Sequence, residues 1–309
     1  MTTQLTMPLR VWAEMALLAL FWGFSFLAIR VALDEVGPWT VVAARLAGAM
    51  VVLWLWVLIR GYAVPRTAKI WVAFMGMGFL NNVIPFGLIA WGQQSIETGL
   101  ASILNASTAV WGVLIAALFL PEERLTWRRG IGVLIGFLGV STAIGLEALR
   151  NFDLRSVSQL AILGAAVSYG FSGVWARRNL RGLRPEVAAA GMLTCSSLVT
   201  ICLAGYYENP LGSDLHASTL IALAYLAVFA TAAAYLVYYR VMAQAGSGNV
   251  MLVTLLVAPV AIVAGAVVLG EALPPRAYAG FAMLALGLVV LDGRLIGAKK
   301  PLAPTAMPR

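Results

Sequence analysis

The two halves of this chain repeat each other, and no other feature restricts its fold as strongly. Residues 12 to 145 align with residues 159 to 293. Four patterns recur at a nearly constant offset: Trp22-Gly-Phe-Ser25 with Tyr169-Gly-Phe-Ser172, Pro38 with Pro185, Glu123-Arg-Leu125 with Glu271-Ala-Leu273, and Gly132 and Gly139 with Gly280 and Gly287. Since a repeated sequence indicates a repeated structural unit, the chain is predicted to fold as two copies of one unit.

The composition indicates that much of this chain lies in lipid. Of its 309 residues, 61% are hydrophobic and 11% are charged, and the mean hydropathy is +0.91. A backbone in the bilayer core must satisfy its own hydrogen bonds, so each crossing is a helix or part of a closed barrel. The apolar runs here are about 20 residues long, which is the length of a membrane helix and about twice that of a barrel strand. The first run, from Ala13 to Val31, is too long for a signal-peptide core, so we expect it to remain as a helix.

Ten such runs are predicted to span the membrane: residues 12–31, 38–59, 70–92, 99–120, 130–148, 159–178, 187–206, 219–240, 248–270 and 278–296. Five fall in each copy, at 12–148 and 159–296, so the second copy must cross in the opposite sense. We therefore predict an all-α membrane protein of ten transmembrane helices, built as two inverted five-helix repeats and followed by a disordered basic tail at 297–309. Inverted repeats are typical of secondary transporters, whose substrate site lies between the repeats.

The net charge of +8 indicates membrane topology rather than nucleic-acid binding. With a cytoplasmic N-terminus, sixteen basic residues fall in inner segments: Arg10, Arg60, Arg66, Lys69, Arg124, Arg128, Arg129, Arg177, Arg178, Arg181, Arg184, Arg240, Arg294, Lys299, Lys300 and Arg309. The outer loops hold Arg150, Arg155 and Arg276. Because basic loops stay in the cytoplasm, both termini are predicted to be cytoplasmic, in a multi-pass protein of the inner cell membrane.

Four motifs in order along the chain carry a resemblance to a known family: Trp22-Gly-Phe-Ser25, Pro38 followed by Ala44-Arg45, the stretch Thr98 to Asn105, and the stretch Phe119 to Trp127 before a glycine-rich helix. Together they resemble the EamA family of the drug/metabolite transporter superfamily, over nearly the whole chain. The resemblance implies ten helices, cytoplasmic termini and the export or exchange of amino acids or other small metabolites, and it points first to the aromatic amino-acid exporters. One departure is Leu120-Pro121-Glu122-Glu123, where the family usually has Phe-Leu-Gly-Glu.

The third predicted span has unusual polarity at its middle, where Asn81 and Asn82 precede Pro85. Proline lacks a backbone donor, so Pro85 frees the carbonyl of Asn81 and favours a kink near the bilayer centre. The polar groups there need a partner, and a substrate is one candidate. The alternative is that the two amides bond across helices and only stabilise the bundle.

Aromatic residues also occur away from the membrane interfaces, where tryptophan and tyrosine normally gather. Those expected near mid-depth are Trp22, Trp111 and Tyr169, with Tyr235 somewhat toward the inside. They are candidates for lining a substrate cavity, and helix packing is the alternative. Trp175 and Tyr239 lie near inner helix ends and are also candidates, although an ordinary interfacial belt explains them equally well.

Arg45 lies about seven residues inside the second predicted span. A charge at that depth is costly unless it faces the bundle or reaches outward. It could anchor a substrate carboxylate, or it could bond to carbonyls of neighbouring helices, as its uncharged repeat equivalent Met192 suggests. Glu123 and Glu271 lie at helix starts and are interpreted as caps.

The sequence offers little for catalysis. A serine nucleophile needs a base within about 3 Å, but His216 belongs to an outer loop and Ser172 to the inner half of a helix. No cluster of Asp, Glu, His or Cys suggests metal ligands. We therefore expect a protein that is not an enzyme, with no cofactor and no metal.

These observations predict a secondary transporter that exports or exchanges small metabolites by alternating access, most readily aromatic or neutral amino acids. Its partners would be a small-molecule substrate and the lipid bilayer, and the oligomeric state is left open. The alternatives are a nucleotide-sugar or phosphate-ester carrier of the same superfamily, or a receptor or scaffold that does not transport. Because no titratable carboxylate or histidine lies near mid-depth, facilitated diffusion or exchange is expected, with Glu14 and Glu97 as the residues that could instead couple transport to protons.

Overall fold

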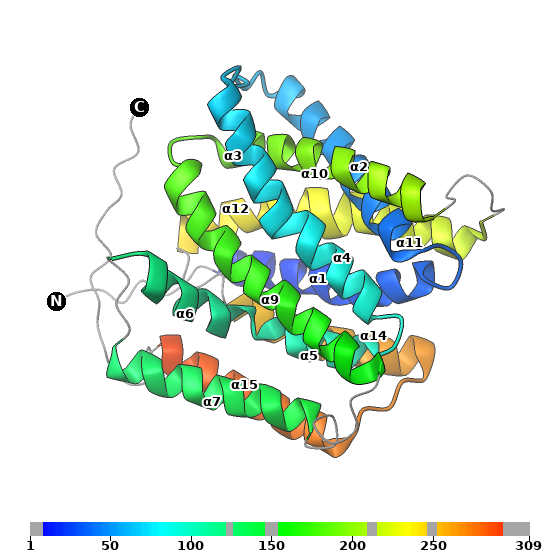
Figure 1. The fold of residues 1–309 in the computed structure, drawn as a ribbon, viewed down its shortest axis with the longest axis vertical. Coiled ribbons are helices and arrows are strands. Elements are labelled where there is room, and N and C mark those ends of the chain that lie inside the picture. Colours follow the sequence, from blue (N-terminus) through cyan, green and yellow to red (C-terminus); the bar gives the residue numbers. More distant parts are fainter. Residues whose placement is uncertain (1–8, 122–125, 146–153, 209–214, 246–251, 293–309) are drawn as a thin grey trace.

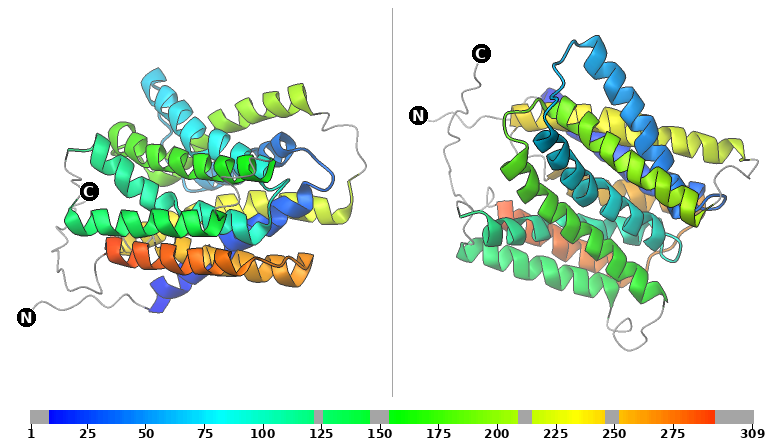
Figure 2. Two further views of the ribbon diagram at one scale, coloured as in Figure 1. Left: turned by 60° about the horizontal axis from the view of Figure 1, so that its bottom comes forward. Right: turned by 45° about the horizontal axis from the view of Figure 1, so that its top comes forward.

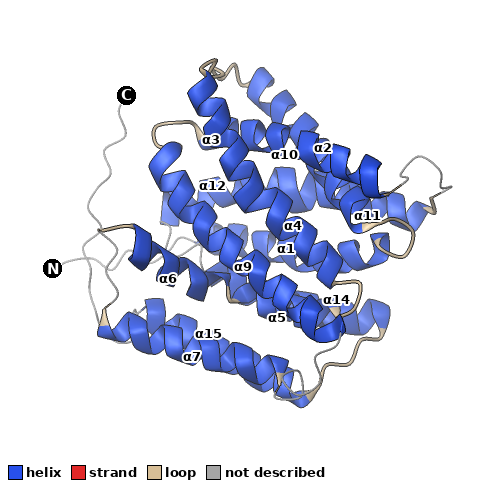
Figure 3. Cartoon of the chain, in the orientation of Figure 1, coloured by secondary structure: helices blue, strands red, loops and turns tan. Residues whose placement is uncertain are grey.

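The structure is a computed structural model that describes residues 9–121, 126–145, 154–208, 215–245 and 252–292 (Figure 1). Within these ranges every regular element is helical (Figure 3). Glu123 and the predicted tail at 297–309 lie outside the described residues.

The first half contains α1 (Leu9–Ala32), α2 (Pro38–Ile59), α3 (Ala68–Gly78), the π-helical segment η1 (Phe79–Val83), α4 (Ile84–Gly92), α5 (Thr98–Ala106), α6 (Thr108–Phe119) and α7 (Trp127–Ile144). The second half contains α9 (Leu154–Asn179), α10 (Pro185–Tyr207), α11 (Ala217–Ala227), the π-helical segment η2 (Val228–Ala233), α12 (Ala234–Ala245), α14 (Leu252–Leu269) and α15 (Pro275–Asp292). Within the described residues, each of the ten predicted spans therefore falls on a helical segment, although several helices, such as α1, α7, α9 and α15, begin earlier than the sequence indicated.

Seven of these segments are long and apolar enough to cross a membrane: Leu9–Ala32, Pro38–Ile59, Ala68–Gly92, Thr98–Phe119, Arg155–Asn179, Pro185–Tyr207 and Ala217–Met242. The apolar stretches of the two last helices are shorter, at Leu256–Leu269 and Pro275–Val290. The first turn of α7 carries Arg128 and Arg129, which lowers the apolar character of this helix. The fold is thus that of an all-helical, multi-pass membrane protein.

Contacts between loops and helix ends define two ends of the bundle. At the end where α1 begins, which we call the terminal end, Glu14 of α1 lies 3.5 Å from Arg240 of α12, and Arg178 of α9 donates to the carbonyl of Phe119 at the end of α6. At the opposite end, which we call the distal end, the loop after α1 meets the start of α11 through Glu35 and His216. Helix α1 therefore runs from the terminal to the distal end, whereas its repeat equivalent α9 runs the other way.

Equivalent helices of the two halves pack against each other. Helix α7 lies along α15, α2 along α10, and α5 against α14, and Figure 2 shows the α7–α15 pair side by side on one side of the molecule. Small residues allow this approach, because a Cβ on Gly139 would lie 2.5 Å from the backbone nitrogen of Leu284. Such pairing of equivalents is what a two-fold axis between two halves produces, and it brings η1 and η2 toward the interface between them.

Candidate functional site

The two π-helical segments occupy equivalent places in the two halves, η1 between α3 and α4 and η2 between α11 and α12. Pro85 explains the first, because a residue without a backbone donor cannot continue the regular α-helical ladder. The Ile84 amide instead bonds to the carbonyl of Phe79, five residues earlier. The carbonyl of Leu80 is satisfied from a neighbouring helix, since the Ser168 hydroxyl donates to it at 2.7 Å. Single π-helical turns are often found at functional sites.

Asn81 and Asn82 of η1 lie in a hydrogen-bond network that joins the two halves. The Asn81 amide donates to the Tyr235 hydroxyl at 3.0 Å, and that hydroxyl donates to Asn82 Oδ1 at 3.1 Å. The fully buried Asn82 donates to Ser196 Oγ at 3.1 Å, and Ser172 Oγ donates to Asn81 Oδ1 at 3.1 Å. The amides therefore do bond across helices, and a role in substrate binding remains a separate proposal.

Arg45 is buried, with 6% of its surface exposed, and it reaches from α2 to η2. Its Nε donates to Thr231 Oγ1 at 2.7 Å, and its Nη2 lies 3.4 Å from the carbonyl of Ala230. The guanidinium carbon stands 3.9 Å from the ring centre of Phe86. Among the ion pairs of the described residues, none involves Arg45. Its charge is thus met by dipoles and a ring face but by no carboxylate.

Aromatic rings connect these polar groups to the terminal half of the bundle. Trp22 of α1 packs on Tyr238 of α12, with ring centres 5.7 Å apart. Tyr238 packs edge-on against Tyr239 at 5.4 Å, and Tyr239 is stacked with Tyr235 at 6.2 Å. The predicted residues Trp22, Tyr235 and Tyr239 therefore belong to one series of rings that ends at the hydroxyl bonded to Asn81.

Tyr169 extends this arrangement from α9. Its ring meets that of Phe86 edge-on at 6.5 Å, and Phe86 in turn carries the Arg45 guanidinium. Seven of the nine predicted site residues are thus linked by contacts around η1 and η2.

Trp111 and Trp175 occupy different surroundings. Trp111 packs edge-on against Phe137 of α7 at 4.8 Å, in a cluster with Ile115. The Trp175 indole donates to the carbonyl of Ala73 at 2.9 Å, and its ring lies against Gly76. Their contacts join α6 to α7 and α9 to α3, so nothing in these contacts supports substrate binding by either residue.

Some residues of the cluster were not among the predicted site residues: Phe86, Ser172, Ser196, Thr231 and Tyr238. Two signals could have indicated them. Tyr235, Tyr238 and Tyr239 are spaced at i, i+3 and i+4, which places all three on one helix face. Ser196 lies one helical turn after Met192, so it is on the same face of α10 as the repeat equivalent of Arg45, a residue already selected as a candidate.

The serine and histidine considered for catalysis have separate partners. Ser172 Oγ donates to Asn81 and to the carbonyl of Tyr169, in the middle of the bundle. His216 is the N-cap residue of α11 and pairs with Glu35 at the distal end. The two side chains therefore do not form a nucleophile and base pair.

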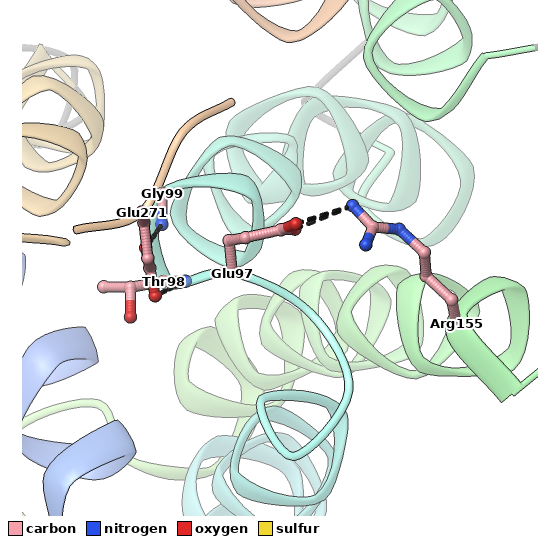
Figure 4. A network of polar contacts seen from close by, with 5 residues as sticks. All are labelled: Glu97, Thr98, Gly99, Arg155 and Glu271. Atoms are coloured by element: carbon pink, nitrogen blue, oxygen red, sulfur yellow. Dashed lines mark hydrogen bonds and ion pairs between the residues drawn. The ribbon is translucent and has the colours of Figure 1, made fainter. Parts of the chain in front are cut away.

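The two carboxylates considered for proton coupling are both held by arginines. Glu97 receives two bonds from Arg155, at 2.9 and 2.8 Å (Figure 4). Glu14 is only 9% exposed, because α1 begins at Leu9 and places it in the second turn of the helix. Its Oε1 lies 3.3 Å from Arg10 and 3.5 Å from Arg240.

Glu271 does cap a helix, but not the one expected from the sequence. It precedes α15, yet its carboxylate accepts from the backbone amides of Thr98 at 2.9 Å and Gly99 at 3.4 Å, at the start of α5 (Figure 4). The cap therefore joins the second half of the chain to the first. The sequence could not show this, since the partner helix is about 170 residues away.

With this geometry established, comparison with known proteins defines the family. The sequence profile of the EamA-like transporter family matches residues 11–144 and again residues 157–291. This chain belongs to the EamA-like transporter family. The family assignment inferred from the four motifs is thereby confirmed, and the protein is a membrane transporter.

Three relatives of this EamA-family transporter match it over more than nine-tenths of its length. The "Probable terminal-alkyne amino-acid exporter" of Streptantibioticus cattleyicolor is 28% identical over 94% of this chain and 95% of its own. An uncharacterized transporter of Archaeoglobus fulgidus is 23% identical over 92% of this chain and 99% of its own. The uncharacterized inner membrane transporter YedA of Escherichia coli is 25% identical over 94% and 92%.

One solved crystal structure resembles this EamA-family transporter in fold. It has a TM-score of 0.65 at 20% sequence identity, and the match covers 91% of this chain and 96% of that one. At this identity the likeness extends to the fold alone.

Proposed function

We propose that this EamA-family transporter is a secondary transporter that exports or exchanges small amphipathic metabolites carrying a carboxylate, with aromatic or neutral amino acids as the substrate class. It acts by alternating access between its two halves and performs no enzymatic reaction. The amino-acid exporter among its relatives supports this class, although their identity is low.

The observation that carries the proposal is the buried Arg45, which has no carboxylate partner among the described residues. Removing a charge from water is unfavourable unless an opposite charge compensates it. Arg45 has five N–H donors, and two of its nitrogens are bonded to Thr231 and Ala230. Donors therefore remain for a ligand, and a substrate carboxylate would complete the charge balance.

The remaining cluster suits the rest of an amino acid. Asn81 and Asn82 provide amide oxygens for an ammonium group, and Tyr169, Tyr235, Tyr239 and Trp22 provide ring faces for an apolar side chain. In the described conformation these polar groups bond to one another. Substrate binding would therefore exchange protein–protein hydrogen bonds for bonds to the ligand, and the site would open as it binds.

Transport by purified protein in liposomes tests this function. We expect neutral and aromatic amino acids to move down an imposed substrate gradient and to exchange with internal amino acid, without a pH gradient. Nucleotide sugars and phosphate esters serve as comparison substrates, and transport of these alone would establish the alternative carrier function. Failure to move any of the compounds would favour a receptor or scaffold.

The same liposomes test energy coupling. With no substrate gradient, an imposed pH gradient is expected to cause no accumulation, because the central cluster around η1 and η2 contains no carboxylate. Accumulation that disappears in Glu14→Gln would overturn this and identify Glu14 as the coupling residue. Glu97→Gln tests the second candidate, since its carboxylate also pairs with an arginine but lies at the distal end, and loss of the accumulation in this variant would instead identify Glu97 as the coupling residue.

We further propose that all ten helical segments span the membrane as two inverted repeats, at 12–148 and 159–296, with both termini cytoplasmic. Two exposed positions test this, Ala63 at the terminal end and Ser218 at the distal end. In a variant with Cys195 and Cys202 replaced by alanine, Ala63→Cys should react with an impermeant thiol reagent only from the cytoplasm, and Ser218→Cys only from outside. Labelling of both from one side would contradict the topology.

A further inference from the structure

Three glutamates at the distal end reach across the boundary between the two halves. Glu208, at the end of α10, accepts from the backbone amides of Trp39 at 2.9 Å and Thr40 at 2.7 Å. It also accepts from the Thr40 hydroxyl at 2.7 Å. Glu208 therefore caps the start of α2, which belongs to the other half.

Glu271 and Glu35 repeat this arrangement at two other helices. Glu271 of the second half caps α5 of the first through the amides of Thr98 and Gly99 (Figure 4). Glu35 of the first half accepts from the amide of His216 at 2.9 Å, the N-cap residue of α11 in the second half. Carboxylates are stabilised at helix starts by free amides and by the helix dipole.

Glycines next to two of these carboxylates leave room for the contacts. A Cβ at Gly37 would collide with the Glu208 carboxylate, and one at Gly265 with that of Glu271, so glycine leaves the room that each carboxylate occupies. The pKa of Glu35 is lowered, first by a hydrogen bond from the Thr219 side chain and then by His216. Lowering the pKa favours the ionised form, which is the form that accepts these bonds.

The repeat makes two of these contacts one-sided. In an inverted repeat, the equivalents of Glu35 and Glu208 lie at the terminal end, and at the offset of Pro38 and Pro185 they are Gly182 and Gly61. Both are glycines at positive φ, 80° and 63°, and neither has a side chain to cap a helix. The equivalent of Glu271 is Glu123, outside the described residues.

Among the described residues, the contacts between halves at the terminal end include arginine contacts of another kind. Examples are the pair of Glu14 with Arg240 at 3.5 Å, Arg184 over the Tyr62 ring at 4.4 Å, and the bond from Arg178 to the carbonyl of Phe119. The contacts made by Glu35 and Glu208 at the distal end therefore have no symmetric counterparts at the terminal end, because glycine occupies both equivalent positions.

We propose that Glu35, Glu208 and Glu271 form one latch that holds the distal end of the bundle closed in the resting protein. The three contacts break together when the halves rearrange, which makes the glutamates positioning residues for transport. A polar hollow of ≈ 380 Å³ lined by Arg30, Gln93, Glu97 and Glu271, among others, reaches the Glu271 contact from the distal end. The proposal rests on the alternating access proposed above.

Hydrogen exchange of the full-length protein in lipid nanodiscs tests the latch without any substrate, so its outcome is separate from that of the transport assay. Glu271→Gln removes one charged contact. If the latch is one unit, exchange should rise about tenfold or more not only at the start of α5 but also at the amides of Trp39 and Thr40, which Glu208 holds. A simple cap would affect α5 alone.

Two controls make the result decisive. Asp34→Asn removes a carboxylate at the same end whose partner, Arg30, lies four residues earlier in the same half of the chain, and it should leave the α2 and α5 amides unchanged. Amides at the start of α10, at the terminal end, should also keep their wild-type exchange in Glu271→Gln. Exchange raised only in α5, or raised equally at both ends, would overturn the proposal. If Glu271→Gln does not fold, Glu208→Gln read at the Thr98 and Gly99 amides applies the same test.

Discussion

Replacing Arg45 with methionine is expected to reduce transport of a neutral amino acid on the order of 100-fold, because the substrate carboxylate loses its charged partner. Hydrogen bonds to a charged group contribute about 1.5–3 kcal/mol each, and about 2.8 kcal/mol corresponds to 100-fold in affinity. Methionine is the residue at the equivalent position 192 of the second half, where it is buried. The chain therefore already accommodates this side chain in the same helix environment.

The decisive measurement is the preference for an amino acid over its carboxamide. The wild-type protein should transport the acid far better than the amide, and Arg45→Met should transport both equally poorly. Thr231→Val is the matched control, because it removes the partner of Arg45 Nε but keeps the charge, so the preference for the acid should remain. If Arg45→Met retained that preference, Arg45 would be a structural residue bonded to η2 and nothing more.

The chain's architecture could be predicted because it depends on features that are local in sequence. Apolar runs of helix length locate the helices, whatever their neighbours in the bundle. Pro85 marks the place where η1 interrupts the helical segment formed by α3 and α4. The repeat offset shows which helices are equivalent, but it does not show which helices touch. Helix α7 packs on its equivalent α15, whereas α1 packs mainly on α14, so these contacts needed the structure. The second interruption, η2, has no proline and could not be located in this way.

Residues of the cluster around η1 and η2 could be predicted only where the residue type was unusual for its depth. Asn81, Asn82 and Arg45 are polar at positions where lipid-facing residues are apolar, which indicates a buried role. Trp111 was selected by the same reasoning, and Trp175 as an aromatic residue near an inner helix end. The contacts of both are those of helix packing, because an indole in a bundle is equally stable between helices. A sequence does not distinguish these two environments.

The latch glutamates were the least predictable residues. Glu208 and Glu35 lie at helix ends, where acidic residues are common, and each acts on a helix nearly 170 or more residues away. Only the packing of the two halves in three dimensions brings each carboxylate to the start of a helix in the other half. Comparing the repeat copies gives the one sequence signal, since Glu35 and Glu208 align with Gly182 and Gly61 where the flanking prolines are retained.

The α7–α15 pair carries the second large effect, this time on stability. Gly139→Ala should destabilise the protein by about 3 kcal/mol, the upper part of the range for overpacking. The added Cβ would lie 2.5 Å from the backbone nitrogen of Leu284 and 2.7 Å from the carbonyl of Gly280. Backbone atoms cannot rotate away as a side chain can, so the two helices must separate and lose the close packing that stabilises membrane bundles.

Gly130→Ala is the matched control, because it lies in the same helix and a Cβ there meets nothing within 4 Å. Alanine is a better helix former than glycine by up to about 1 kcal/mol. The midpoint temperature of thermal unfolding in detergent should therefore be unchanged or slightly higher for Gly130→Ala and clearly lower for Gly139→Ala. Equal midpoints would show that the helices adjust freely. The Gly139→Ala protein that does fold should still prefer an amino acid over its amide, whereas Arg45→Met should lose that preference, which separates the bundle's packing from its substrate site.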